Sequence, residues 1–218
     1  MANALVFGAG NIGRGFLGVL LRQSGYEVTF VDVDETRVNL INHYGEYPIF
    51  ICSETGVQEQ MVTGVRAIAF SDQERLVQAI CGADVILTAV GKSALQHVAK
   101  PIAIGLVERI KFNPRSQAHI VVIACENVRD NTSYLANLVL RAIDQEFHVT
   151  VRDHVSFPDC IVDRVVPNVE IKNGHPLRVS VEDYFQFVVD HSQLQQEFPA
   201  ISGVEIVPDV SAKLDQKL

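Results

Sequence analysis

Short apolar runs alternate with amphipathic stretches along the first two-thirds of the chain. Apolar runs that end at glycine or polar residues are typical of buried parallel strands, which are predicted at residues 4–7, 27–33, 83–90 and 118–125. Helices, recognised by apolar positions three or four residues apart, are predicted over residues 12–24, 34–43, 71–80 and 130–147. Two further helical stretches are expected on either side of Pro101, which interrupts them. The alternation predicts an α/β fold with a doubly wound parallel sheet.

Two regions depart from this alternation. Residues 47–52 and 62–70 are rich in β-forming residues around the polar segment 53–60, which predicts two strands and a turn outside the main sheet. Beyond residue 150 the pattern becomes β-rich, with a turn signal at Asn173-Gly174. A polar, proline-containing segment then begins at residue 192, so we expect a first domain over residues 1–191 and a separate segment over residues 192–218.

The composition excludes several classes of protein. A net charge of −8 argues against a nucleic-acid-binding protein, because phosphate contacts need clustered lysines and arginines. No apolar run approaches the ~18 residues that a membrane-spanning helix requires. The seven histidines and four cysteines show no zinc-ligand spacing, so no metal site is expected. The cysteines are scattered and are expected to be free thiols in a reducing cytoplasm: Cys52, Cys81, Cys125 and Cys160.

A glycine-rich motif lies between the first predicted strand and the first predicted helix: Gly8-Ala9-Gly10-Asn11-Ile12-Gly13. Its spacing matches the dinucleotide-binding fingerprint GxGxxG. In that motif Gly8 permits a tight turn, Gly10 lets the backbone approach a pyrophosphate, and Gly13 lets the helix lie close to the strand. The N-terminus of the helix presents its N–H groups to the phosphates. A plain turn at a glycine-rich strand end is the alternative reading.

Asp32 ends the second predicted strand, 19 residues after Gly13. An acidic side chain at this place binds the ribose hydroxyls of the adenosine. A carboxylate there also repels a 2′-phosphate, so the sequence predicts NAD rather than NADP as the cofactor. The alternative role, capping the next helix, suits the neighbouring Asp34 better.

Two other predicted strands end in small or polar residues, at the edge of the sheet where ligands of parallel sheets bind. Val90 and Gly91 would let the cofactor pass close by, and Glu126 is also expected at the cofactor. The amide of Asn127 can donate a hydrogen bond to a developing alkoxide or to the nicotinamide carboxamide. Alternatively, Asn127 only starts the turn into the next helix.

Asp163 and Arg164 interrupt the apolar run at residues 155–166. A charged pair in such a run is either a structural ion pair or part of a site. Taken alone, these two residues favour the structural reading.

Three motifs together resemble those of the polyol-specific long-chain dehydrogenases, and among these the mannitol-1-phosphate 5-dehydrogenases. They are FGAGNIGRGF at residues 7–16, ACEN at 124–127 and VDRVVP at 162–167. The resemblance implies an expanded Rossmann domain that binds NAD over residues 1–191, followed by a linker and the start of a truncated helical substrate domain over 192–218. It also implies a metal-free interconversion of D-mannitol 1-phosphate, a sugar-phosphate substrate, and D-fructose 6-phosphate.

The resemblance further implies the catalytic residues. The family motif Lys-Leu-x-x-x-Asn-x-x-His is matched by Lys217-Leu218 in its first two positions, and its Asn and His have no counterpart here. Lys217 is implied as the general base, Asn127 as a group that holds the alkoxide, and Asp163 as a residue that supports the site. A lysine base needs a lowered pKa, which an exposed Lys217 would lack, so the chain is expected to be incomplete for catalysis.

Two alternatives stay open. A dehydrogenase of the same family acts instead on an unphosphorylated polyol or a hexuronate, or the chain is a non-catalytic NAD-binding module. Neither a nucleic acid nor a membrane is expected as a partner in any of these cases.

Overall fold

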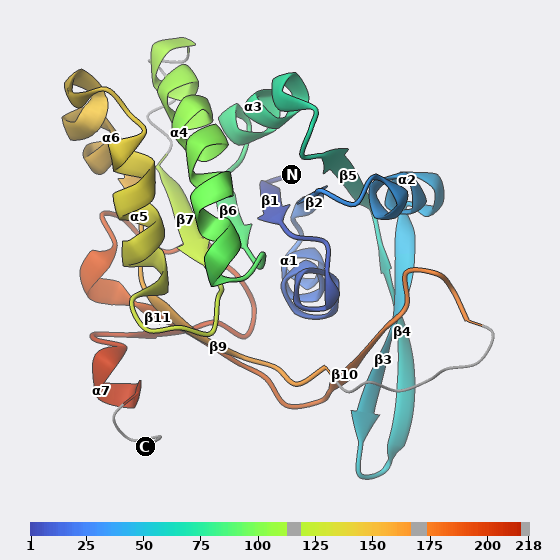
Figure 1. Ribbon diagram of the computed structural model, residues 1–218. Coiled ribbons are helices and arrows are strands. Elements are labelled where there is room, and N and C mark those ends of the chain that lie inside the picture. Colours follow the sequence, from blue (N-terminus) through green and yellow to red (C-terminus); the bar gives the residue numbers. More distant parts are fainter. Residues whose placement is uncertain (113–118, 167–173, 215–218) are drawn as a thin grey trace.

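The computed structural model describes residues 1–112, 119–166 and 174–214, and its centre is a six-stranded parallel sheet (Figure 1). In spatial order its strands are β5 (Val65–Ala69), β2 (Glu27–Asp32), β1 (Asn3–Phe7), β6 (Val85–Thr88), β7 (Ile120–Ala124) and β8 (Val155–Ser156). The chain builds outward from β1 through β2 to β5, then crosses over and builds outward through β6 in the other direction. This reversal is the doubly wound topology, so the predicted fold class is confirmed.

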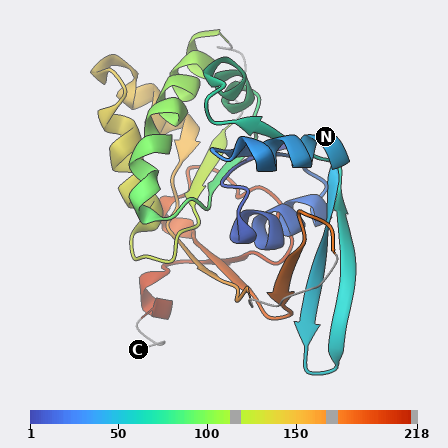
Figure 2. The ribbon, with the colours of Figure 1, turned by 45° about the vertical axis from the view of Figure 1, so that its right-hand side comes forward.

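Helices cover both faces of this sheet (Figures 1 and 2). One face carries η1 (Gly13–Gly18), which is a π-helix, then α1 (Val19–Gln23) and α2 (Glu35–Tyr44). The other face carries α3 (Gln73–Cys81), α4 (Leu95–Phe112), α5 (Asn131–Arg141) and α6 (His148–His154). Three short 3₁₀ segments are η2 (Lys92–Ala94), η3 (Gln145–Phe147) and η4 (His191–Gln193). Because the central strands are buried on both faces, they are apolar at nearly every position.

Two smaller sheets flank the central one. In the first, β3 (Glu46–Ser53) and β4 (Gly56–Thr63) form an antiparallel hairpin that projects from the body, and β10 (Val179–Glu182) lies parallel to β3 (Figure 1). In the second, β11 (Gln186–Asp190) lies between antiparallel β9 (Cys160–Asp163) and parallel β12 (Glu205–Val207). The predicted excursion from the main sheet is confirmed for this hairpin, but the second predicted strand, residues 62–70, is mostly β5 and belongs to the main sheet. The turn residue Asn173 lies outside the described residues.

The predicted interruption at Pro101 is wrong, because α4 runs through this residue without a break. A proline inside a helix costs about 3 kcal/mol through its missing hydrogen bond and its ring clash. Three side chains of this helix, Val98, Ile102 and Leu106, are buried against the sheet. Since each contributes about 1.5–3 kcal/mol, their burial exceeds the cost of the proline.

Two other boundaries differ from the sequence prediction. The polar segment 53–60 is mostly strand rather than turn. The sequence did not predict this strand, because β4 has little burial on either face and lacks the alternation by which strands are recognised. The predicted helix over 130–147 ends at Arg141. Asp144 has an extended backbone there, which turns the chain while Ile143 stays buried in the core.

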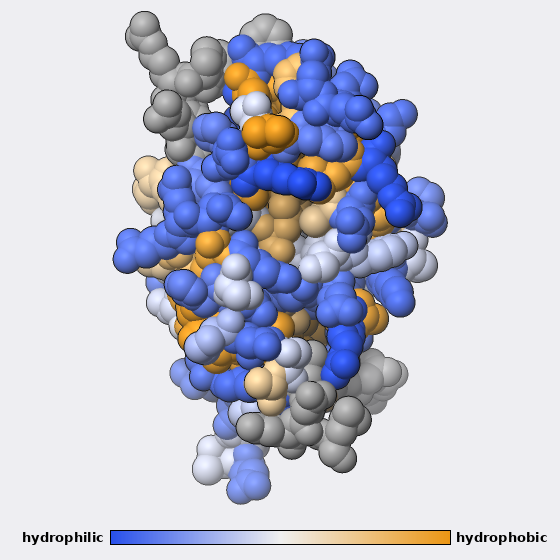
Figure 3. Space-filling view, turned by 90° about the vertical axis from the view of Figure 1, so that its left-hand side faces the viewer, coloured by the Kyte–Doolittle hydropathy of each residue, from blue (hydrophilic) through white to orange (hydrophobic). Residues whose placement is uncertain are grey.

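Residues 192–214 pack against the rest of the chain. Val207 and Val210 form a small apolar cluster with Ile161 and Val188, and β12 joins the sheet of β11. The predicted domain boundary near residue 191 stays a prediction. The side of the molecule that lies at the left of Figure 1 is mainly hydrophilic, with scattered apolar groups (Figure 3).

Candidate functional site

The glycine-rich loop follows β1 and opens the first helix. Gly8 has a φ of +95° and donates its N–H to Val31 O at 2.7 Å. A Cβ on Gly8 would lie 2.4 Å from Ala89 O, and one on Gly13 would lie 1.9 Å from Gly8 O. A Cβ on Gly10 would meet no atom within 4 Å, so the loop is open to solvent there. The tight turn at Gly8 and the close approach of the helix at Gly13 are as predicted, and Gly10 leaves open space beside the backbone. That a pyrophosphate binds there stays a prediction.

The carboxylate of Asp32 ties the end of β2 to this loop. Its Oδ2 accepts the N–H of Ala9 at 2.7 Å, and its Oδ1 accepts the N–H of Asp34 at 2.9 Å. The guanidinium of Arg37 lies 3.1 Å from Oδ1 and forms an ion pair with it. Only 8% of Asp32 is exposed. Asp34 caps α2 by accepting the N–H of Arg37, as predicted.

A cavity of about 530 Å³ opens beside the loop and Asp32, at the carboxyl ends of the central strands. Its lining is mainly apolar: Phe7, Gly8, Gly10, Val31, Asp32, Val33, Phe70, Ala89, Val90, Ala94, His97 and Val98. The structure thus brings together four predicted residues, Gly8, Gly10, Asp32 and Val90. Gly91 follows Val90 with a φ of +83° and leads into η2.

Glu126 is buried next to this cavity without lining it. Its carboxylate accepts the hydroxyl of Thr88 at 2.8 Å and the N–H of Val90 at 3.0 Å. Burial raises its pKa, and these hydrogen bonds oppose the rise. Glu126 therefore joins the end of β7 to the end of β6 and fixes the backbone at Val90.

Of the three residues that the resemblance implied for catalysis, the structure describes Asn127 and Asp163, and it does not bring them to the same cavity. Asn127 is exposed and lines a second, polar cavity of about 420 Å³ together with Glu126 and Cys160. Asp163 is exposed at the end of β9 and does not line this cavity. Lys217 lies outside the described residues.

Several residues that the sequence prediction missed hold this edge of the sheet. Asn131 donates to Glu126 O at 2.9 Å and to Cys160 O at 3.0 Å, which links β9 to the end of β7. Arg14 is buried beneath the glycine loop, and its guanidinium donates to Ala9 O. The signal for Arg14 was a charged residue within an otherwise apolar helix, and for Thr88 a polar residue at the end of a buried strand.

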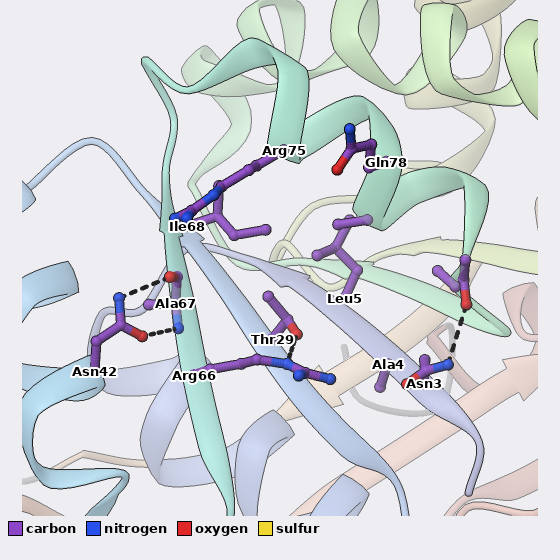
Figure 4. Close-up of a pocket in the computed structure, with 13 residues that line it drawn as sticks. Asn3, Ala4, Leu5, Thr29, Asn42, Arg66, Ala67, Ile68, Arg75 and Gln78 are labelled. Carbon is purple, nitrogen blue, oxygen red and sulfur yellow. Dashed lines mark hydrogen bonds between the residues drawn. The ribbon is translucent and has the colours of Figure 1, made fainter.

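A third cavity, of about 490 Å³, lies near the opposite ends of the strands, between α3 and the strands β1, β2 and β5 (Figure 4). Its polar side chains are already paired within the protein. Asn42 makes two hydrogen bonds with the backbone of Ala67, and Arg66 Nε donates to Thr29 Oγ1 at 3.0 Å. This cavity has no contact with the glycine loop, so it belongs to a different part of the fold.

Within the described ranges, no group of three or more His, Cys, Asp or Glu side chains is arranged to bind a metal ion. The four cysteines are all free thiols, and Cys125 and Cys160 are buried. No helix in the described part of the chain is long and apolar enough to cross a membrane.

Solved structures share this fold at low sequence identity. A putative 2-dehydropantoate 2-reductase from Enterococcus faecalis is 14% identical, with a TM-score of 0.60 over 100% of this chain and 60% of that chain. An octopine dehydrogenase in complex with NADH and agmatine is also 14% identical, with a TM-score of 0.56 over 98% of this chain and 45% of that one. At this identity the likeness is one of fold.

Curated relatives are closer in sequence. The mannitol-1-phosphate 5-dehydrogenase of Brevibacillus brevis is 40% identical over 99% of this chain and 54% of its own length. That of Thermoanaerobacter pseudethanolicus is 38% identical over 100% of this chain and 55% of its own length. The chain therefore spans about half the length of these relatives. Residues 2–203 match the family model of the mannitol dehydrogenase Rossmann domain, and the chain belongs to this family.

Proposed function

We propose that the chain is the NAD-binding part of a mannitol-1-phosphate 5-dehydrogenase, which converts D-mannitol 1-phosphate and NAD⁺ to D-fructose 6-phosphate and NADH. The observation that carries the proposal is the glycine loop tied by Ala9 to Asp32, at the wall of an apolar cavity of about 530 Å³. The sequence similarity to mannitol-1-phosphate 5-dehydrogenases supports the choice of substrate.

Three groups of residues fit the cofactor. The opening of the helix after Gly10, through Asn11, Ile12 and Gly13, suits the pyrophosphate, because unpaired N–H groups point out of a helix N-terminus. Asp32 suits the adenosine ribose, and the apolar walls beside it suit the adenine ring. Val90 and Gly91 flank the path between the two ends of the dinucleotide, where Glu126 fixes Val90. When bound, NAD⁺ supplies the hydride acceptor of the reaction.

The chain's own residues have separate tasks in the proposed reaction. Asn127, exposed at the polar cavity, can donate a hydrogen bond to the substrate oxygen as its negative charge develops. Lys217 would take the hydroxyl proton, provided that surrounding groups lower its pKa. Asp163 would support the substrate side of the site from the end of β9. We place the enzyme in the cytoplasm, where its four free cysteines stay reduced.

The test follows NADH absorbance with fructose 6-phosphate for two proteins. One is this chain, and the other continues through the second half that the relatives possess. Turnover by the longer protein with fructose 6-phosphate, and none with unphosphorylated fructose or a hexuronate, supports the proposal. NAD binding without turnover in either protein would instead identify a binding module. A preference for an unphosphorylated substrate would reassign the enzyme within its family.

A further inference from the structure

Arg14 is a buried cation directly beneath the glycine loop. Only 5% of it is exposed, and burial lowers its pKa to about 10. Its guanidinium donates to two backbone oxygens, that of Ala9 and, at 3.3 Å, that of Leu177. Among the residues that the structure describes, no carboxylate forms an ion pair with it. Carbonyl oxygens carry only partial charge, so the positive charge of Arg14 is not neutralised within the described protein.

A buried charge without a counter-ion is expensive in free energy. The neighbouring Arg37 shows the usual solution, since it is partly exposed and is paired with Asp32 and Asp34, each at 3.1 Å. Arg14 forms no such pair with a carboxylate in the described part of the chain, although Asp32 and Asp34 lie near enough to act on its charge. An anion that binds from the solvent side of the loop would offset this cost.

The hydrogen bond from Arg14 to Ala9 O brings the influence of the buried charge to one peptide group. The carbonyl of Ala9 and the N–H of Gly10 belong to the same peptide, so donation to the oxygen polarises the N–H at the other end. The same loop residue donates its own N–H to Asp32 at 2.7 Å, which fixes its orientation. Gly10 is the open position of the loop, where a ligand can approach the backbone.

We infer that Arg14 is a positioning residue for the cofactor pyrophosphate, acting through the Ala9–Gly10 peptide and its buried charge rather than by direct contact. The inference rests on the proposed dinucleotide function and adds the origin of the phosphate affinity. A purely structural arginine, which only joins the loop to Leu177, would support adenosine and ADP binding equally. The proposed role affects only ligands that carry phosphates.

The experiment measures the dissociation constants of adenosine, ADP and NAD by calorimetry for the wild-type chain, Arg14→Met and Arg14→Lys. We expect Arg14→Met to weaken ADP and NAD binding about tenfold and to leave adenosine binding within about twofold. Arg14→Lys keeps the charge and is expected to recover most of the ADP affinity. Tyr47→Phe is the matched control, because it removes only the 2.8 Å hydrogen bond from Tyr47 Oη to Arg14 O. It should affect adenosine and ADP alike.

Equal losses for adenosine and ADP in Arg14→Met, or equal ADP losses in the Met and Lys variants, would overturn the inference while leaving the proposed function intact. If Arg14→Met does not fold, Arg14→Gln replaces it, since its amide can still donate to Ala9 O without a charge. The same ADP-specific loss is expected of it. A wild-type chain that binds neither ADP nor NAD overturns the proposed function and this inference together.

Discussion

One carboxylate oxygen of Asp32 accepts a hydrogen bond of 2.7 Å from the backbone N–H of Ala9, in the middle of the glycine loop. Its other oxygen holds Arg37 at 3.1 Å. One side chain therefore orients the loop and restrains the guanidinium of Arg37. In NADP-dependent proteins of this fold such a cation accommodates the 2′-phosphate, so we expect Asp32 to favour NAD also by holding Arg37.

Replacing Asp32 by alanine removes the carboxylate and releases Arg37. We expect Asp32→Ala to weaken NAD binding about 10- to 100-fold, because hydrogen bonds to a charged group contribute ~1.5–3 kcal/mol. The freed guanidinium reduces the discrimination against NADP at the same time. Calorimetric titration with both dinucleotides gives the two dissociation constants. An affinity ratio equal to that of the wild-type chain would remove the assignment of Asp32.

Asp34→Ala is the matched control, because Asp34 accepts the N–H of Arg37 at the start of α2. We expect this variant to lose about 1 kcal/mol of stability with its helix cap. Its preference for NAD over NADP should stay that of the wild-type chain, since Arg37 remains held by Asp32.

Alanine substitutions at two glycines of the loop are expected to act differently, one on stability and the other on NAD binding. An alanine Cβ at position 13 would lie 1.9 Å from the backbone oxygen of Gly8, so we expect Gly13→Ala to cost about 3 kcal/mol in stability. The Cβ of Gly10→Ala meets no protein atom within 4 Å, so folding is preserved and NAD affinity falls. Urea unfolding and NAD titration measure the two effects. Strong destabilisation by Gly10→Ala would contradict the open loop.

The elements that the sequence predicted correctly are those whose pattern is local. The buried strands β1, β6 and β7 are nearly unbroken apolar runs, and the glycine spacing lies within six residues, Gly8 to Gly13. The continuity of α4 through Pro101 was missed because it depends on burial against the sheet. Strand β4 was missed because its exposed residues carry no alternation.

In the candidate site too, the residues predicted correctly are those with a local sequence signal. Asp32 was predicted from its distance to the glycine motif, and the structure places it at the loop. The hydrogen bonds of Glu126 could not be predicted, since its partners Val90 and Thr88 precede it in the sequence by 36 and 38 positions. Arg14 was overlooked because one of its hydrogen-bond partners, Leu177 O, lies 163 residues away in the sequence.

Glu126 should make stability depend on pH. Its pKa in the folded chain is raised above the ordinary value of 4.5 by burial. The folded state then holds this proton more tightly than the unfolded state, so the contribution of Glu126 to stability is greatest below 4.5 and falls as pH rises towards the folded-state pKa. A tenfold difference in proton affinity between the two states corresponds to about 1.4 kcal/mol of stability.

Glu126→Gln keeps the shape of this side chain and cannot ionise. Urea unfolding of both proteins from about pH 4 to about pH 8 gives the difference in free energy of unfolding. We expect wild type to lose stability relative to Glu126→Gln as pH rises through this window. A difference that does not change with pH, or that changes in the opposite direction, would contradict the raised pKa.

Asp159 caps α5 from outside the helix, by accepting the N–H groups of Thr132 at 2.9 Å and Ser133 at 2.8 Å. Asp130 occupies the N-cap position itself, with a φ of +54° and no capping hydrogen bond from its side chain. We therefore expect Asp159→Ala to cost about 2 kcal/mol in free energy of unfolding. Asp130→Gly should be neutral or stabilising by up to ~1 kcal/mol, because glycine tolerates a positive φ. Urea unfolding of both variants decides the matter: a larger loss from Asp130→Gly than from Asp159→Ala would place the cap at residue 130.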